Sequence, residues 1–241
     1  LFRCDSAAFG ALCEETPVSG VPELVVGVFD EKKEACIVDF ANKRLGGAWL
    51  SYGMVQEEKM FIERFDLGAL AARALVEMPD PAASPGLACA LSMHEDEAWV
   101  LKGAPRWARL GWYGWTKPGA LEQMELLDPG EDRRSSPTVI AIDAIKADFV
   151  QYEAEALRKM ATKAYAGFAA ARHDPKVGGH ETMATGHWGC GAFKNNEKVM
   201  FVVQSLAADL AGVRLRYHLP PVELTGGRGV DLAPATAMLE E

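Results

Sequence analysis

The stretch VDFANKRLGGAWLSYGMVQEEKMF, residues 38–61, contains an apolar β-branched run, a glycine pair and the start of a helix-like segment. Gly46 and Gly47 predict a turn, and Glu57 and Glu58 stand at the head of the segment in which apolar residues recur at helical spacing. Two adjacent glutamates repel each other and gain little from burial unless they bind something. Their place just behind a glycine turn therefore marks them as candidate functional residues.

Strands and helices alternate along the rest of the chain. Short apolar runs bounded by turn residues begin at residues 23, 34 and 138, another covers 213–219, and helix-like segments cover 56–76, 148–173 and 197–212. Short runs of this kind are typical of buried strands. Strands that alternate with long helices predict an α/β layered fold.

Length and composition are those of a folded globular protein, with room for one large α/β domain or, as the alternative, two small ones. The chain has 241 residues, of which 49% are hydrophobic and 24% charged. We expect one domain over residues 1–241, with residues 1–20 as an N-terminal extension and about 222–241 as a mobile tail. No apolar run approaches the roughly 20 residues that span a bilayer. Because the N-terminus also lacks the pattern of a signal peptide, we expect an intracellular protein with no membrane partner.

Charge and cysteine spacing narrow the classes of ligand. The formal net charge of −9 argues against a protein that holds nucleic acid through Lys and Arg, so a phosphorylated ligand has to be held locally by backbone N–H groups. The five cysteines show no zinc-site spacing and are typical of reduced intracellular thiols. We therefore expect no metal and no cofactor.

A second informative stretch, ATGHWGCGAFKNN, covers residues 184–196. Gly186, Gly189 and Gly191 recur every two or three residues immediately before a helix-like segment. Glycines let a ligand approach the backbone, and a helix N-terminus directs free N–H groups at one point. This loop therefore predicts a phosphate or diphosphate site, the alternative being a purely structural loop.

The first stretch offers groups suited to sugar chemistry. Cleavage of a glycosidic bond needs a carboxylic acid that protonates the leaving oxygen. Asp39 and Asn42 at the strand end can bind hydroxyls, and Glu57 and Glu58 supply an acceptor and a proton donor. Such an acid needs a raised pKa, which a neighbouring carboxylate and burial favour and a helix N-terminus opposes. The alternative for the pair is a solvent-exposed helix start, where acidic residues are common.

Together the two stretches resemble the poly(ADP-ribose) glycohydrolase family. Residues 38–61 resemble its glycine turn followed by Gln-Glu-Glu, and TGHWGCGAFKNNEKVMFVVQSLAA, residues 185–208, resembles its diphosphate-binding loop and the helix behind it. AIDA (141–144) and KAYAGF (163–168) lie between them in the family's order. The resemblance implies a macrodomain-like three-layer α/β/α fold with a mixed central sheet. It also implies hydrolysis of the ribose–ribose O-glycosidic bonds of poly(ADP-ribose), with release of ADP-ribose.

The resemblance further implies a role for each matching residue. Glu58 matches the acid that protonates the leaving ribose oxygen, and Glu57 matches the glutamate that helps to hold the ribose hydroxyls. Asp39 and Asn42 match the aspartate and asparagine of the VDFAN segment, Asp39 being the third catalytic residue. The other substrate-binding positions are Gln56, Gly46, Gly47, His187, Gly189, Cys190, Gly191, Ala192 and Phe193.

Three positions depart from the family's pattern. Ala48 stands where the third glycine of a triplet is expected. His187 replaces an asparagine, and it either donates a hydrogen bond or is simply a different surface residue. The tyrosine that stacks on adenine has no clear match, since an ungapped comparison puts Leu110 there and Trp112 or Tyr113 is the expected substitute. The alternative for these aromatic residues is core or loop packing.

The departures leave two alternative functions. One is a macrodomain that binds ADP-ribose without turnover, and the other is a hydrolase of another ADP-ribose conjugate. The intact Gln-Glu-Glu favours catalysis, because a binding protein needs no proton donor. The expected partners are poly(ADP-ribose) or ADP-ribose and ADP-ribosylated proteins, with no sequence-specific nucleic acid. The chain resembles a compact form, since about 20 residues precede the first expected strand in place of the family's long helical accessory region.

Overall fold

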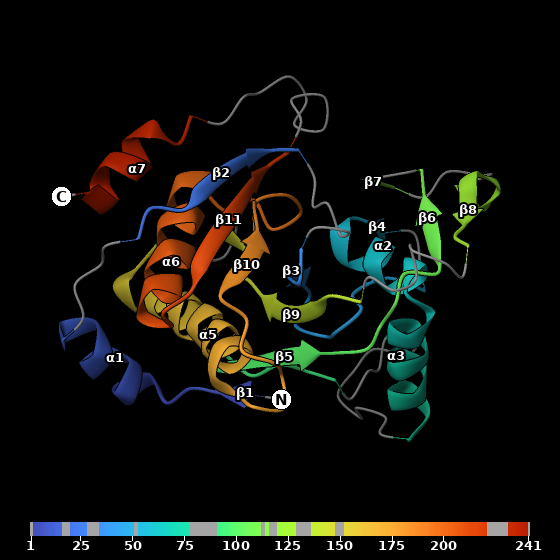
Figure 1. Ribbon diagram of the computed structural model, residues 1–241, viewed down its shortest axis with the longest axis horizontal. Coiled ribbons are helices and arrows are strands. Elements are labelled where there is room, and N and C mark those ends of the chain that lie inside the picture. Colours follow the sequence, from blue (N-terminus) through green and yellow to red (C-terminus); the bar gives the residue numbers. More distant parts are fainter. Residues whose placement is uncertain are drawn as a thin grey trace.

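The structure, a computed structural model, describes residues 2–15, 20–27, 34–50, 53–77, 91–111, 114–115, 120–128, 136–147, 152–220 and 231–240. Within these ranges seven strands form one mixed sheet in the order β1-β5-β9-β3-β10-β11-β2 (Figure 1). The strands are β1 (Phe2–Arg3), β5 (Glu97–Leu101), β9 (Thr138–Asp143), β3 (Cys36–Ala41), β10 (Thr182–Thr185), β11 (Arg214–Leu219) and β2 (Glu23–Val26). The strands from β9 to β2 run parallel, whereas β5 is antiparallel to β9 and β1 to β5.

Helices cover both faces of this sheet (Figure 1). Helices α5 (Ala154–His173) and α6 (Glu197–Leu210) cover one face, and α2 (Gln56–Glu63) and α3 (Phe65–Glu77) cover the other. Successive side chains of a strand point to opposite faces. In β3, Val38 therefore packs in the core on the α5 side and Ile37 in the core on the α2 side. The three-layer α/β/α fold with a mixed sheet that the sequence predicted is confirmed.

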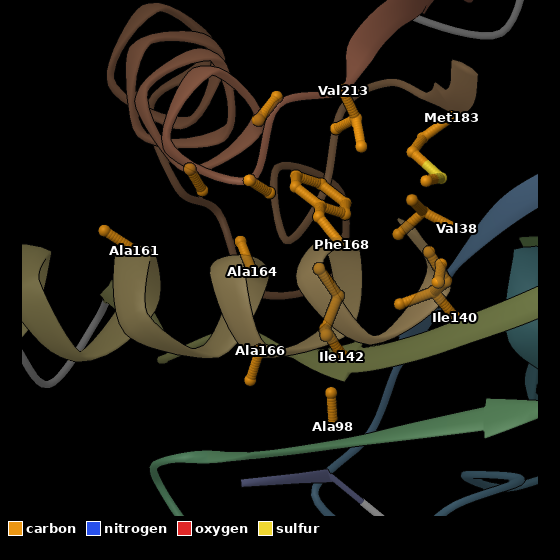
Figure 2. Packing of buried hydrophobic residues seen from close by; sticks show 14 of the residues in the cluster. Val38, Ala98, Ile140, Ile142, Ala161, Ala164, Ala166, Phe168, Met183 and Val213 are labelled. Carbon is orange, nitrogen blue, oxygen red and sulfur yellow. The ribbon is translucent and has the colours of Figure 1, made fainter. Parts of the chain in front are cut away.

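Close packing fixes α5 against the sheet. Figure 2 shows Phe168 of α5 between Val213 and Ile142, in a cluster of buried apolar side chains. A Cβ atom on Gly167 would lie only 2.5 Å from Cγ2 of Ile140 in β9. The glycine of the KAYAGF segment is therefore needed for the contact between helix and strand.

The prediction of a single helix over residues 56–76 is wrong, because the chain forms two helices there. Arg64 separates α2 from α3 with a φ of −115° and a ψ of 85°, which are not helical values. Its side chain is fully buried, and the guanidinium donates a hydrogen bond to the carbonyl oxygen of Ala104. A buried cation needs such a partner, and the bend at Arg64 accompanies this contact.

Both ends of the described chain pack against the central layers. In the N-terminal extension, β1 joins the edge of the sheet and α1 (Ser6–Glu15) contacts α5. At the other end we expected a mobile tail over 222–241, but α7 (Ala233–Glu240) lies on α6. Burial of Leu232 and Leu239 with Phe201 and Tyr217 stabilises this contact. Residues 221–230 and 241 lie outside the described part of the chain.

Two small sheets extend beyond α2, on the side away from α5 (Figure 1). One pairs β4 (Gly53–Met54) with β7 (Gly114–Trp115), and the other pairs β6 (Ala108–Leu110) with β8 (Met124–Leu126), next to the 3-10 helix η1 (Ala120–Gln123). Across the described ranges, every helix is too short or too polar to cross a membrane.

Candidate active site

The two informative stretches of sequence meet at the carboxyl edge of three parallel strands. Asn42 follows β3, Ala144 follows β9, and the loop of residues 186–196 follows β10. A Cβ atom on Gly189 in this loop would lie 2.5 Å from Cβ of Ala144. Asn42, Ala144 and Phe193 also line one cavity. In open α/β sheets, ligands bind at this edge.

Gln56 attaches the start of α2 to β3. Its Nε2 donates to the carbonyl of Val38 at 2.8 Å, and its Oε1 accepts the N–H of Phe40 at 2.7 Å. The next strand, β10, pairs with β3 only at Ile37. The side-chain amide therefore takes over two backbone hydrogen bonds beyond that point, and it places the following glutamates beside the strand end.

Glu57 is buried and held by two backbone donors. The residue is only 2% exposed, and this burial rules out the alternative of a solvent-exposed helix start. Its Oε2 accepts the N–H of Asn42 and its Oε1 the N–H of Gly46, each at 2.7 Å. The carboxylate thus joins the end of β3 to the glycine turn.

Glu58 is bound to the same turn from the other side. It is 7% exposed, and its two oxygens accept the N–H groups of Ala48 and Val55, each at 3.1 Å. Ala48, at the place of the third glycine, thus contributes its backbone N–H. A Cβ atom on Gly47 would lie 2.5 Å from Oε2 of Glu57 and 2.6 Å from Oε1 of Glu58. Glycine is therefore required where the turn crosses the carboxylate pair.

Asp39 completes a buried cluster of three carboxyl groups. It is fully buried, and no described residue donates a hydrogen bond to either of its carboxyl oxygens. Burial, and then the charge of Glu58, raise the pKa of Asp39 from its usual 3.8 to about 8. Burial and the charge of Asp39 also raise the pKa of Glu57, against the effect of its two backbone donors. Three carboxyl groups this close cannot all be ionised, so the cluster retains protons at neutral pH.

The loop of residues 186–196 has its shape fixed by side chains. Asn195 donates from Nδ2 to the carbonyls of Ile145 at 2.7 Å and Gly189 at 3.1 Å. The indole N–H of Trp188, which is fully buried, donates to the carbonyl of Ile142 at 2.9 Å. Tyr152 bonds through its hydroxyl to the side chain of Asn195. These contacts hold the backbone of the loop against β9.

The same loop keeps backbone donors available at its outer turn. None of the described residues accepts a hydrogen bond from the N–H groups of Gly191, Ala192 or Phe193. The loop ends at Asn196, whose side chain caps α6 by accepting the N–H groups of Lys198 and Val199. Free amides beside a helix N-terminus attract an anion.

His187 and Cys190 are partly buried. The His187 ring lies 6.0 Å from that of Tyr217, and among the described residues its Nε2 has no hydrogen-bond partner. Burial lowers the pKa of His187, so the ring is neutral at pH 7. The Cys190 thiol donates to the carbonyl of Trp188, and burial raises its pKa. Cys190 is therefore a neutral thiol at pH 7.

The adenine contact is the part of the predicted site that lies outside the described residues, because Trp112 and Tyr113 fall there. Leu110, the ungapped match, is 2% exposed and donates its N–H to Oε1 of Glu63 at 2.7 Å. It is a core residue, so it offers no surface on which adenine could stack.

A basic cavity beside the strand ends was missed by the sequence reasoning. It has a volume of about 390 Å³, and its walls include Asn42, Phe193 and the lysines Lys43, Lys146, Lys159 and Lys163. The signal was present in the quoted segments, since Lys43 directly follows Asn42 and Lys163 begins KAYAGF. The net charge of −9 gives no sign of this local concentration of lysines. Within the described ranges, no group of three His, Cys, Asp or Glu side chains is suited to a metal ion.

Comparison with protein families gives one match to more than half of the chain. Residues 78–221 match the family described as poly(ADP-ribose) glycohydrolase (PARG), macrodomain fold. The matched range includes the loop of residues 186–196. Glu57 and Glu58 lie before its first residue.

Curated relatives and a solved structure agree with this match. The chain is 27% identical over 233 residues to a probable poly(ADP-ribose) glycohydrolase 2 of Arabidopsis thaliana, covering 82% of this chain and 42% of that protein. It is 29% identical over 235 residues to poly(ADP-ribose) glycohydrolase 1 of Caenorhabditis elegans, covering 90% of this chain and 27% of that protein. The chain thus spans less than half the length of these relatives.

The fold is similar to that of the Thermomonospora curvata poly(ADP-ribose) glycohydrolase bound to the inhibitor ADP-HPD. The TM-score is 0.53 at 18% identity, over 98% of this chain and 82% of that one. At this identity the likeness bears on the fold alone.

Proposed function

The chain belongs to the poly(ADP-ribose) glycohydrolase family of macrodomain fold, and on that premise we propose that it hydrolyses the ribose–ribose O-glycosidic bonds of poly(ADP-ribose) and releases ADP-ribose. The main support is the enclosure of Asp39, Glu57 and Glu58 beside a glycine turn at the carboxyl edge of the sheet. Burying three carboxyl groups together costs free energy, which is characteristic of a site that uses their protons. A protein that only binds ADP-ribose has no such use for them.

Glu58 is the general acid in this proposal. As the bond between the anomeric carbon and the leaving ribose oxygen breaks, Glu58 gives its proton to that oxygen. Water then adds to the anomeric carbon, and its proton restores Glu58. Each oxygen of Glu57 accepts one backbone N–H and keeps a lone pair for a hydroxyl of the reacting ribose.

Asp39 acts through its neighbours rather than on the substrate. Because its pKa is raised to about 8, it is protonated at pH 7. A neutral Asp39 removes one negative charge from beside Glu58. The cluster can then accept an anionic substrate with less repulsion.

The diphosphate of the terminal ADP-ribose unit binds the loop of residues 186–196. The N–H groups of Gly191, Ala192 and Phe193 and the N-terminus of α6 provide donors without a cationic side chain. Gly46 and Gly47 allow the terminal ribose to approach the turn closely. The natural substrate is then the polymer carried by ADP-ribosylated proteins.

The test is incubation of the purified protein with labelled poly(ADP-ribose), beside Glu58→Gln, with products separated by chromatography. We expect free ADP-ribose from the wild type and a turnover at least about 10²-fold lower for the variant, because the Gln amide is too weak an acid to protonate the leaving oxygen. Calorimetry should show that Glu58→Gln still binds ADP-ribose. A melting curve is the control for folding, since Gln keeps only one acceptor oxygen for the N–H groups of Ala48 and Val55.

Three results would contradict the proposal. Near-normal turnover by Glu58→Gln would remove Glu58 from the role of acid. A wild type that binds ADP-ribose but releases nothing from the polymer would be a binding protein. Release of ADP-ribose from mono(ADP-ribosyl) protein alone would identify a hydrolase of a different conjugate.

A further inference from the structure

The basic cavity is adjacent to the catalytic groups and yet separate from them. Its walls include Asn42, whose backbone N–H holds Glu57 at 2.7 Å, but neither Glu57 nor Glu58. Its volume of about 390 Å³ lies in the range typical of small-molecule sites. A ligand group in the cavity would therefore be next to the reacting ribose without occupying the same space.

The charge of the cavity is opposite to that of the whole protein. Its walls carry four lysines against two carboxylates, Asp143 and Glu95. Asp143 pairs with Lys163, and Glu95 pairs with Lys159 at 2.9 Å. No carboxylate in the described part of the chain pairs with Lys43 or Lys146. In a chain of net charge −9, this concentration of positive charge is local and suits an anion.

Phe193 lies between two different places for an anion. On one side, its own N–H belongs to the free donors of the loop of residues 186–196. On the other, its ring is part of the cavity wall, and Nζ of Lys146 lies 5.2 Å from the ring centroid. The structure thus offers backbone amides for one anion and lysines for a second one.

The proposed substrate has the same arrangement of charges. The ribose–ribose bond joins two ADP-ribose units, so one diphosphate lies on each side of the bond that breaks. We propose that the cavity of Lys43, Lys146, Lys159 and Lys163 is the subsite for the diphosphate of the penultimate unit, on the leaving side of the bond. The assignment rests on the proposed function, and it adds a preference for polymer over a single ADP-ribose group.

The test compares two ligands in the Glu58→Gln background, where turnover does not interfere. The ligands are ADP-ribose and the two-unit oligomer, and the variant is Lys43→Gln/Lys146→Gln. The matched control is Lys176→Gln/Arg214→Gln, which removes the same charge from exposed positions at the opposite edge of the sheet, before β10 and at the start of β11. Melting curves verify that each variant is folded.

We expect the preference for the oligomer over ADP-ribose to fall by about tenfold in the cavity variant and to stay unchanged in the control. The slope of log affinity for the oligomer against log salt should also fall by roughly 0.7 per lysine, as for single-stranded nucleic acid. A purely structural role of the lysines would leave that slope unchanged.

Other results would overturn the subsite or the proposed function separately. Equal weakening of both ligands would assign the lysines to the terminal unit instead. An unchanged preference for the oligomer would mean that the cavity holds no part of it. If no protein, including the parent Glu58→Gln, bound either ligand, the proposed function itself would be overturned.

Discussion

The carboxylate cluster and the loop of residues 186–196 lie at the same edge of the sheet but are built in opposite ways. In the cluster, backbone N–H groups of the turn hold the side chains of Glu57 and Glu58. In the loop, the side chains of Asn195 and Trp188 hold the backbone. The proposed functional groups are thus carboxyl side chains in the cluster and backbone N–H groups in the loop.

This difference determines which substitutions affect each region. In the cluster, catalysis should be affected by any substitution that moves a carboxylate, including one in the backbone of the glycine turn. The loop is sensitive to the loss of supporting side chains that never touch the ligand. Catalytic rate and ligand affinity should therefore separate between the two regions.

The largest effect in the comparison is expected for Gly47→Ala. The new Cβ would lie 2.5 Å from Oε2 of Glu57 and 2.6 Å from Oε1 of Glu58, so the carboxylates or the turn must move. A displacement of about 1 Å costs roughly 100-fold in turnover. Steady-state kinetics on poly(ADP-ribose) measures this loss.

The control for that variant is Gly212→Ala. Gly212 has a φ of +67°, similar to the +53° of Gly47, but a Cβ there meets no atom within 4 Å. It therefore introduces the backbone strain without the contact. Similar kinetics for the two variants would mean that strain alone explains the loss and that the turn does not position the carboxylates.

A smaller effect, mainly on affinity, is expected for Asn195→Ala. The variant leaves the carbonyls of Ile145 and Gly189 without the side-chain donor, and Asn195 is only 4% exposed. Loss of a buried hydrogen-bond partner costs about 1–3 kcal/mol, and we expect roughly tenfold weaker binding of ADP-ribose. Calorimetry and kinetics together should show a raised KM with kcat changed little. A fall in kcat alone would contradict the division between the two regions.

For Asp39 the expected effect is on stability, through its dependence on pH. Its pKa is 3.8 when exposed and about 8 when folded, so between these values the folded state binds the proton and the unfolded state does not. Raising the pH from 4 to 8 therefore lowers the free energy of unfolding, by at most about 1.4 kcal/mol per pH unit. Asp39→Asn removes this contribution, so relative to the wild type it should be more stable at pH 8 than at pH 5.

Urea unfolding at the two pH values measures the difference. Asp128→Asn changes the same charge at an exposed position and serves as the control. An Asp39→Asn variant with the same pH dependence as the wild type would mean that Asp39 is ionised in the folded protein at pH 7. Its place in the proposed mechanism would then be wrong.

Several features of the site followed from local patterns in the sequence. The apolar runs at residues 34 and 138 form β3 and β9, because β-branched and other apolar residues favour buried strands. The helix predicted to follow the loop of residues 186–196 begins at Glu197. Asn196, directly before it, is the N-cap. The family resemblance also assigned the residues of the two quoted stretches to one site, and the roles of these residues stay predictions.

Other features depend on contacts between segments far apart in the chain. The bend at Arg64 accompanies its bond to the carbonyl of Ala104, which lies 40 residues later. The basic cavity combines Lys43, Lys146 and Lys163 from three segments, and no spacing in the sequence relates them. The core position of Leu110 likewise depends on Glu63, 47 residues away.

Local sequence patterns were enough to predict the α/β class, four of the seven strands of the main sheet, and the residue types at the two loops. They could do so because hydrophobic periodicity and glycine spacing reflect local backbone preferences. The shared buried enclosure of Asp39, Glu57 and Glu58, and the lysines beside it, arise from contacts between distant segments. Burial and the field of neighbouring charges depend on which segments pack together, and that packing sets the pKa of Asp39 near 8 rather than 4.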